Sequence, residues 1–150
     1  MIIMMEATFI SSGKNMNEAI DFTVKLTSMV LTGGINFLEA NKIDIFCCNI
    51  DDASHLDNLL WEKPKYCLIA HNLVNKSSDD PVKIGYPGTK FDLGSDTLLN
   101  LSPDFPPDLG GYKNYLQMVV MDEGDLRERA AETWSKCKKM GLKARFVEDL

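Results

Sequence analysis

The sequence lacks the patterns that define several common protein classes. No apolar run reaches the roughly 18 residues that a membrane-spanning helix needs. The first five residues carry no basic charge and no long apolar stretch, so they do not resemble a secretory signal peptide. The four cysteines show no Cys-x-x-Cys spacing, which fits a reducing compartment better than a disulfide framework. We therefore expect a cytoplasmic protein without a membrane segment.

Catalytic and cofactor motifs are also missing. The chain has no Gly-x-Gly-x-x-Gly dinucleotide fingerprint and no Gly-x-Ser-x-Gly nucleophile motif. Gly13 and Lys14 follow a predicted strand, as in a phosphate-binding loop. That motif, however, requires glycine where Thr8 stands and serine or threonine where Asn15 stands. We expect neither a catalytic site nor a bound cofactor.

The cysteines and histidines are poorly placed for a metal site. Cys67 and His71 are four positions apart, and on a strand such residues lie about 13 Å apart. They could share an ion with Cys48 and His55 only if the strand ended between the first pair. Thiols in apolar strands mostly serve as packing residues. The sequence therefore predicts no metal site.

The composition is that of one soluble globular domain. The chain has 150 residues, of which 45% are hydrophobic and 25% charged. Periodicity predicts helices at 17–40, 54–61 and 123–140, and strands at 6–10, 43–48, 66–69, 82–86, 97–101 and 116–121, with 146–147 as a candidate edge strand. This alternation favours an α/β fold, a three-layer Rossmann-like domain over residues 1–150, with a largely parallel sheet and helices on both faces.

Two adjacent glycines fall inside the first predicted helix. Gly33 and Gly34 each cost roughly 1 kcal/mol relative to alanine in a helix interior. Gly33 falls on the apolar stripe, where a close approach of the helix to a sheet would compensate for that cost. The alternative is a break at this pair, which would give two helices.

Charge is unevenly distributed along the chain. The formal net charge is −6, but residues 127–145 hold seven basic and two acidic residues, a net of +5. The other positions hold nine basic and twenty acidic residues, a net of −11. Such a basic segment can attract an acidic partner that the acidic body repels. The alternative is a solvated helix whose cations complement the helix dipole.

The last predicted helix carries two rows of side chains. Leu126, Ala130, Thr133, Cys137 and Met140 form the inward apolar stripe. Beside it runs a second row, called here the Trp134 row, which consists of Arg127, Ala131, Trp134 and Lys138. This row suits a peptide that carries carboxylates and one aromatic ring. Alternatively, Trp134 is a tryptophan at the edge of the core, flanked by basic side chains that reach into solvent.

A second tryptophan ends the short predicted helix. Leu60 and Trp61 precede Glu-Lys-Pro. A tryptophan at such a helix end commonly packs into the core. It can also act as an exposed anchor for a partner.

Five segments, in this order, resemble the chi subunit family of bacterial DNA polymerase III. They are LDNLLW at 56–61, LIAHNL at 68–73, PVKIG at 81–85, DTLLNL at 96–101, and the last helix running into KMG at 139–141. The order and spacing hold from about Ile43 to Leu142. Relatives often carry a basic residue at the positions of Ala131 and Ser135, an aromatic at that of Leu68, and a proline at that of Ala70.

This resemblance implies a non-catalytic accessory subunit of the replicative polymerase. Its expected partners are the psi subunit of the clamp loader and the acidic, Phe-ended C-terminal tail of single-stranded DNA-binding protein, so that DNA is contacted only indirectly. The resemblance assigns the tail site to Val120, Arg127, Trp134 and Ser135, together with Lys138 of the Trp134 row. It assigns the psi-facing patch to Leu60, Trp61 and Leu68.

Two other classes stay open. A small-molecule or nucleotide-binding enzyme on a Rossmann-like sheet would hold its ligand near 11–15 and 48–52, at the carboxyl ends of two strands. Direct binding of nucleic acid by the basic segment is less well supported, because Trp134 is the only aromatic residue in that helix available to stack on bases.

Overall fold

The structure is a computed structural model that describes residues 6–33, 40–62, 71–73, 81–91 and 94–148. Its helices are α1 (Met16–Leu31), α2 (Ile50–Glu62) and α3 (Asp125–Lys139). Its strands are β1 (Glu6–Ser11), β2 (Ile43–Phe46), β3 (His71–Leu73), β4 (Val82–Gly85), β5 (Thr97–Asn100), β6 (Asn114–Val119) and β7 (Lys143–Val147).

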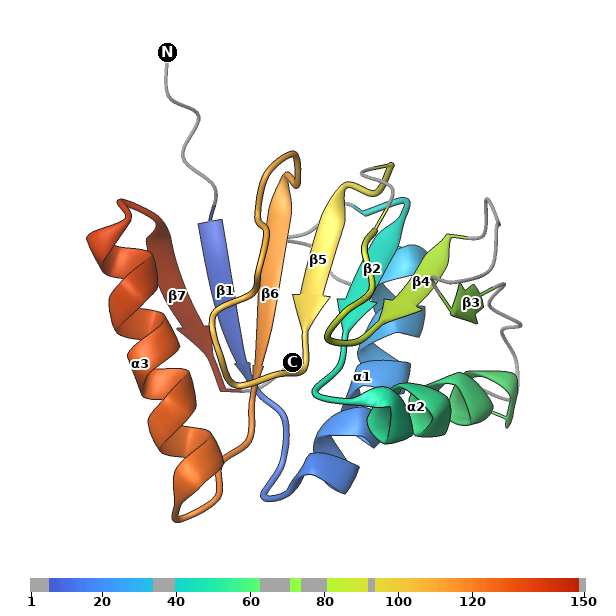
Figure 1. The fold of residues 1–150 in the computed structure, drawn as a ribbon, viewed down its shortest axis with the longest axis horizontal. Helices are drawn as coiled ribbons and strands as arrows, with labels where there is room; N and C mark the ends of the chain where they lie inside the picture. The colour runs from blue at the N-terminus through green and yellow to red at the C-terminus, as the bar shows by residue number, and fades with distance from the viewer. Residues whose placement is uncertain (1–5, 34–39, 63–70, 74–80, 92–93, 149–150) are drawn as a thin grey trace.

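The described strands form one sheet in the order β3-β4-β2-β5-β6-β1-β7. Every neighbouring pair is parallel. Helices α1 and α2 pack on one face of this sheet, and α3 packs on the other face beside β7 (Figure 1). The predicted three-layer α/β fold with a parallel sheet is therefore confirmed.

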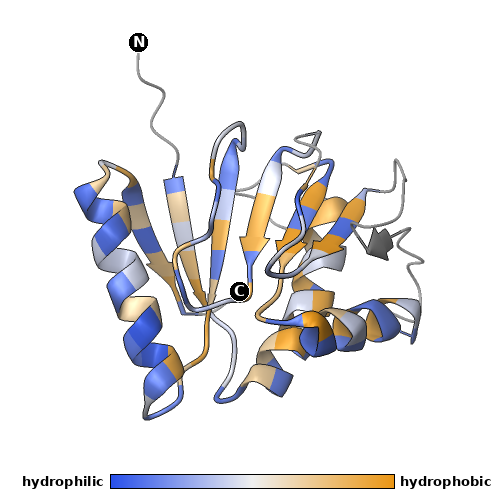
Figure 2. Cartoon of the chain, in the orientation of Figure 1, coloured by the Kyte–Doolittle hydropathy of each residue, from blue (hydrophilic) through white to orange (hydrophobic). Residues whose placement is uncertain are grey.

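Buried side chains form one cluster on each face of the sheet. The cluster under α1 and α2 includes Ile10, Ile45 and Leu116, which are at most 1% exposed. The cluster under α3 includes Phe9 and Tyr115, the sequence neighbours of two of those residues. This alternation follows from the two-residue repeat of a strand. Figure 2 shows α3 as largely hydrophilic, because only one stripe of it faces the sheet.

Most predicted strands and helices are found, and most boundaries shift by only a few residues, although α1 ends at Leu31 and not at 40. Helix α2 begins at Ile50 rather than at 54, because the Asn49 side chain accepts a hydrogen bond from the Asp52 amide at 2.8 Å and starts the helix earlier. The short strand β3 was not predicted, since three residues carry too little periodicity. The predicted strand at 66–69 lies outside the described residues.

Helix α1 ends before the glycine pair. Gly33 has a φ of +77°, and it follows the Thr32 amide, which closes the last turn onto Ser28. Gly33 is also exposed, and an added Cβ would meet nothing within 4 Å. The placement of Gly33 on a buried stripe was therefore wrong. Gly33 instead adopts the left-handed backbone conformation that ends the helix.

Gly85, in contrast, is required by close packing. An added Cβ would lie 2.7 Å from Cζ of Phe91 and 2.9 Å from Oγ1 of Thr89, because the following loop folds back over the end of β4. We expect Gly85→Ala to lower the free energy of unfolding by about 1–3 kcal/mol through overpacking, as measured by urea denaturation. The control is Gly110→Ala, whose nearest contact is an exposed aspartate side chain that can move. Equal stability of the two variants would contradict the packing argument.

Candidate functional site

One flank of α3 is attached to the loop between β5 and β6. The Arg129 guanidinium donates to both carboxylate oxygens of Asp104, at 2.9 and 2.6 Å. These bonds hold the pKa of Asp104 below its usual range. The Thr133 hydroxyl donates to the carbonyl oxygen of Pro103 at 2.6 Å. Because this flank faces β5 and β6, the opposite flank, which carries the Trp134 row, faces β7 and the edge of the sheet.

The first turn of α3 is fixed by Asp122. Its carboxylate accepts hydrogen bonds from the amides of Gly124, Leu126 and Arg127, at 3.2, 3.4 and 3.0 Å. These bonds lower the pKa of Asp122. At the other end, three lysines occupy the last turn, where their charges complement the helix dipole. Arg127 therefore starts the Trp134 row at a well-anchored helix terminus.

A hollow of about 370 Å³ lies between the Trp134 row and the sheet edge. We call it the α3 hollow. Its lining is mostly apolar, with one guanidinium and one carboxylate: Phe9, Val119, Met121, Arg127, Ala130, Ala131, Trp134, Phe146 and Glu148. These residues come from β1, from β6 and the loop after it, from α3, and from β7 and the residue after it. The arrangement offers an apolar cavity beside cations.

Trp134 forms one wall of the α3 hollow. Its ring lies edge-on against the ring of Phe9, with centroids 5.0 Å apart and planes at 74°. The Lys138 ammonium lies 5.3 Å from the centroid of the indole, in range for a cation–π contact. The side chain of Trp134 is half-buried. It is thus rigidly packed, yet accessible from the hollow.

The structure brings together part of the predicted tail site. Arg127 and Trp134 line the α3 hollow, and Lys138 lies over the indole. Ser135 is exposed on α3 but is not among the lining residues.

Val120 lies on the other face of the sheet. It is 3% exposed and packs in the cluster under α1 and α2. Its neighbours Val119 and Met121 line the hollow instead, because successive side chains of an extended chain point to opposite faces. Phe9 and Phe146 were not predicted as site residues, because only the pairing of β1 with β6 and β7 brings these rings beneath α3.

The residues of the predicted psi-facing patch are also divided, between the core and the surface. Leu60 is 1% exposed and belongs to the core under α2, so its side chain does not reach the surface. Trp61 is 57% exposed and Ile50 is 54% exposed. They lie eleven positions, or about three turns, apart and therefore on the same side of α2. Leu68 lies outside the described residues.

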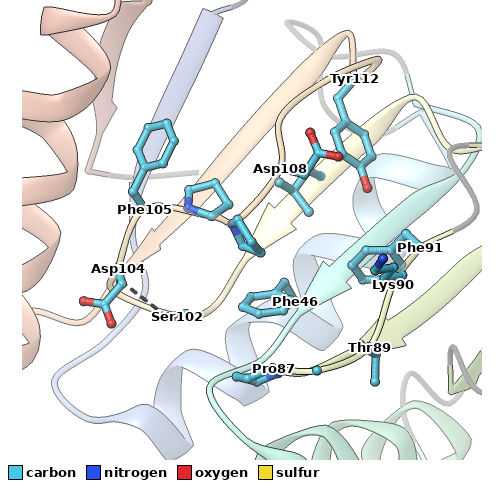
Figure 3. A pocket seen from close by; sticks show the side chains of 14 residues that line it. Phe46, Pro87, Thr89, Lys90, Phe91, Ser102, Asp104, Phe105, Asp108 and Tyr112 are labelled. Carbon is cyan, nitrogen blue, oxygen red and sulfur yellow. Dashed lines mark hydrogen bonds between the residues drawn. The ribbon is translucent and has the colours of Figure 1, made fainter.

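A larger cavity of about 710 Å³ lies on the same face of the sheet as α3 but over β2 and β5. The connection between β5 and β6 is a loop, so no described helix covers this area (Figure 3). Figure 3 shows Phe46 between Pro87 and Thr89 on one side and Asp108 on the other. None of the lining residues belongs to 11–15 or 48–52, where an enzyme ligand was considered.

The described residues offer little for metal or thiol chemistry. Among them, no three His, Cys, Asp or Glu side chains are grouped to hold a metal ion. Burial raises the pKa of Cys137 to about 11 and also raises the pKa of Cys48, so both thiols stay protonated at neutral pH. No helix in the described part of the chain is long and apolar enough to span a bilayer.

Comparison with known protein families identifies a relationship for this chain. The family model described as DNA polymerase III chi subunit, HolC, matches residues 4–145. That range contains the three helices and every described strand except the last two residues of β7. No curated protein matches the chain.

Proposed function

The chain belongs to the DNA polymerase III chi subunit family, and from this premise we propose that it connects the clamp loader to single-stranded DNA-binding protein. The family itself indicates an accessory role in replication, and the resemblance seen in five sequence segments is confirmed. In the proposed role, the chain holds a psi-type subunit through α2. It holds the acidic, Phe-ended tail of single-stranded DNA-binding protein through the α3 hollow.

The single observation that carries the proposal is the composition of the α3 hollow. Phe9, Val119 and Met121 provide an apolar floor for an aromatic ring. Arg127 borders the floor and Lys138 lies over Trp134, so two cations are within reach of carboxylates that precede or end the peptide. Both cations are exposed and lie in the segment of net charge +5. The chemistry of the site thus matches an acidic peptide with one aromatic side chain.

The positions of the two surfaces support a bridging role. Trp61 and Ile50 lie on α2, which packs on one face of the sheet, whereas α3 packs on the other face at the opposite end (Figure 1). Two partners therefore do not compete for the same area. These two large apolar side chains, exposed on one side of α2, offer apolar surface that a partner would cover. The contribution of Leu68 to the psi-facing patch stays a prediction.

We expect a synthetic peptide of aspartates ending in phenylalanine to bind at micromolar strength, on the order of −8 kcal/mol. Raising the salt concentration from about 50 to about 500 mM should weaken binding severalfold, because the ion pairs are exposed and screened. Isothermal calorimetry measures both effects. The control peptides replace the phenylalanine with alanine, or all aspartates with asparagine, and both should bind much more weakly. If the original peptide does not bind at low salt, the tail-binding function is wrong.

A further inference from the structure

β7 is an edge strand of the sheet. It pairs with β1 on one side, in a register that runs from Glu6 opposite Lys143 to Ile10 opposite Val147. On its other side no strand of the described residues pairs with it. Its sequence contains no proline, and its five residues pair with β1 without a bulge. Alternate amide and carbonyl groups of β7 therefore point away from β1, toward the side where an added strand would lie.

The α3 hollow opens beside this edge. Phe146 of β7 lines the hollow and is 44% exposed. Arg129 and Thr133 attach the far flank of α3 to the loop before β6, so the Trp134 row lies on the side of α3 nearest β7. A strand added to β7 would run alongside this row and next to the ring of Phe146.

Cations lie on both faces of the β7 edge. Ala144 packs in the cluster under α3, and Phe146 lines the hollow on that same face. Lys143 and Arg145 alternate with them and point to the opposite face, where Lys143 also forms an exposed ion pair with Glu6 at 3.9 Å. Lys138 lies on the α3 side of the sheet. Consecutive carboxylates of an added acidic strand alternate in the same way, so each face of that strand meets at least one cation.

The lining also indicates the direction of the strand. The hollow lies at the carboxyl end of β7, where Arg127 and Glu148 border it. Lys143 begins β7, and Lys138 lies near the end of α3 that leads into it. An aromatic C-terminal residue in the hollow would place its terminal carboxylate near Arg127 and its preceding acids toward Lys138 and Lys143. This direction is parallel to β7, like every other pair in the sheet.

We propose that the acidic peptide binds by strand addition, running parallel to β7 with its terminal aromatic ring in the α3 hollow. This inference rests on the proposed function, and it adds a recognition mode based on main-chain hydrogen bonds. Such bonds give affinity without demanding a particular residue, while the hollow and the cations select an aromatic end and an acidic body. Glu148 is the one acid among the lining residues, and it opposes carboxylates at the carboxyl end.

A scan of backbone-methylated peptides tests the proposal. Each peptide amide in turn is N-methylated in the aspartate-rich, Phe-ended probe, and its dissociation constant is measured by calorimetry. Methylation of amides that face β7 should weaken binding about fivefold each, the effect of one lost hydrogen bond. Methylation of the alternate amides should change it less than about twofold. The sensitivity therefore alternates along the peptide.

Hydrogen exchange on the protein provides an independent measurement. The amides of β7 should exchange more slowly when the unmodified probe is bound, whereas those of β3, at the opposite edge of the sheet, should be unchanged. Glu148→Gln should bind the probe about two- to fivefold more tightly, because a repelling carboxylate is removed.

The possible results separate this inference from the proposed function. If the unmodified probe binds, but methylation has the same effect at every position and the exchange of β7 is unchanged, strand addition is wrong and the tail-binding function stands. If the unmodified probe does not bind, the tail-binding function fails, and strand addition fails with it.

Discussion

Trp134→Ala is expected to weaken binding of the acidic peptide about thirtyfold, equivalent to roughly 2 kcal/mol. The indole forms a wall of the α3 hollow, is held in place by Phe9 at 5.0 Å, and carries Lys138 over its ring. Alanine would remove the surface against which the aromatic end of the peptide packs. It would also release Lys138 from its position beside the peptide carboxylates. Calorimetric titration at low salt measures the change.

Trp61→Ala is the matched control for this experiment. Both substitutions remove a tryptophan from a helix, but Trp61 lies on α2 and is 57% exposed, away from the hollow. Trp61→Ala should leave the affinity for the peptide unchanged and weaken binding of a psi-type subunit. Trp134→Ala should have the reverse pattern of effects. An unchanged peptide affinity in Trp134→Ala would rule out the hollow as the tail site.

A second variant guards against loss of folding in Trp134→Ala, since the indole also packs on Phe9. Lys138→Glu changes an exposed side chain and should preserve the fold, which circular dichroism can verify. The reversed charge should weaken binding of the peptide about tenfold or more, because it places a carboxylate where the peptide carboxylates need a cation. It should also reduce the salt dependence of binding.

Asp44→Ala is expected to destabilise the fold by about 2–4 kcal/mol, because each buried hydroxyl left without its acceptor costs roughly 1–3 kcal/mol. Asp44 lies in β2 and is 0% exposed. Its carboxylate accepts a hydrogen bond from the hydroxyl of Ser95 at 2.7 Å and another from that of Tyr112 at 2.6 Å. Lys83 of β4 stands beside it in the sheet register and is also buried. Alanine would leave the two buried hydroxyl donors of Ser95 and Tyr112 without this acceptor. Urea denaturation measures the loss.

Asp108→Ala is the control for Asp44→Ala. Asp108 also lies near Tyr112 at the 710 Å³ cavity, but it is exposed and accepts a hydrogen bond only from the nearby Gly110 amide among the contacts described. Its replacement should change the free energy of unfolding by less than about 0.5 kcal/mol. Asp44→Asn keeps one acceptor oxygen, so its change in the free energy of unfolding should lie between those of the two alanine variants. A loss below about 1 kcal/mol in Asp44→Ala would show that the buried carboxylate is not needed.

Local sequence patterns were sufficient for much of the fold. Period-two and helical repeats identified most strands of the sheet, though not β3, and the helices of both covering layers, because those repeats directly reflect which side chains face the core. The boundaries of the helices followed less directly from these repeats. Asn49 extended α2 by capping it, and Gly33 ended α1 by adopting a positive φ. Both effects depend on the hydrogen bond or backbone conformation of a single residue, which the periodicity of apolar residues does not reveal.

The candidate site was only partly visible in the sequence. The spacing of Arg127, Trp134 and Lys138 follows from helix geometry alone, so their common flank was predicted. The aromatic lining from the sheet was not predicted, because Phe9 and Phe146 approach α3 only through the pairing of β1 with β7. Val120 was assigned to the site from the resemblance, but side chains alternate along the extended chain and that of Val120 lies on the opposite face.

By itself, the sequence determined the alternation of strands and helices, the basic segment and the aromatic residue within it, since all of these are local in the chain. The sequence also indicated an edge strand at 146–147, and β7 is an edge strand. Only the tertiary structure decided that the Trp134 row faces this edge, and that Leu60 is buried while Trp61 is exposed. The physical reason is that strand order and contacts between distant segments depend on the packing of the whole core, which no local repeat of side chains encodes.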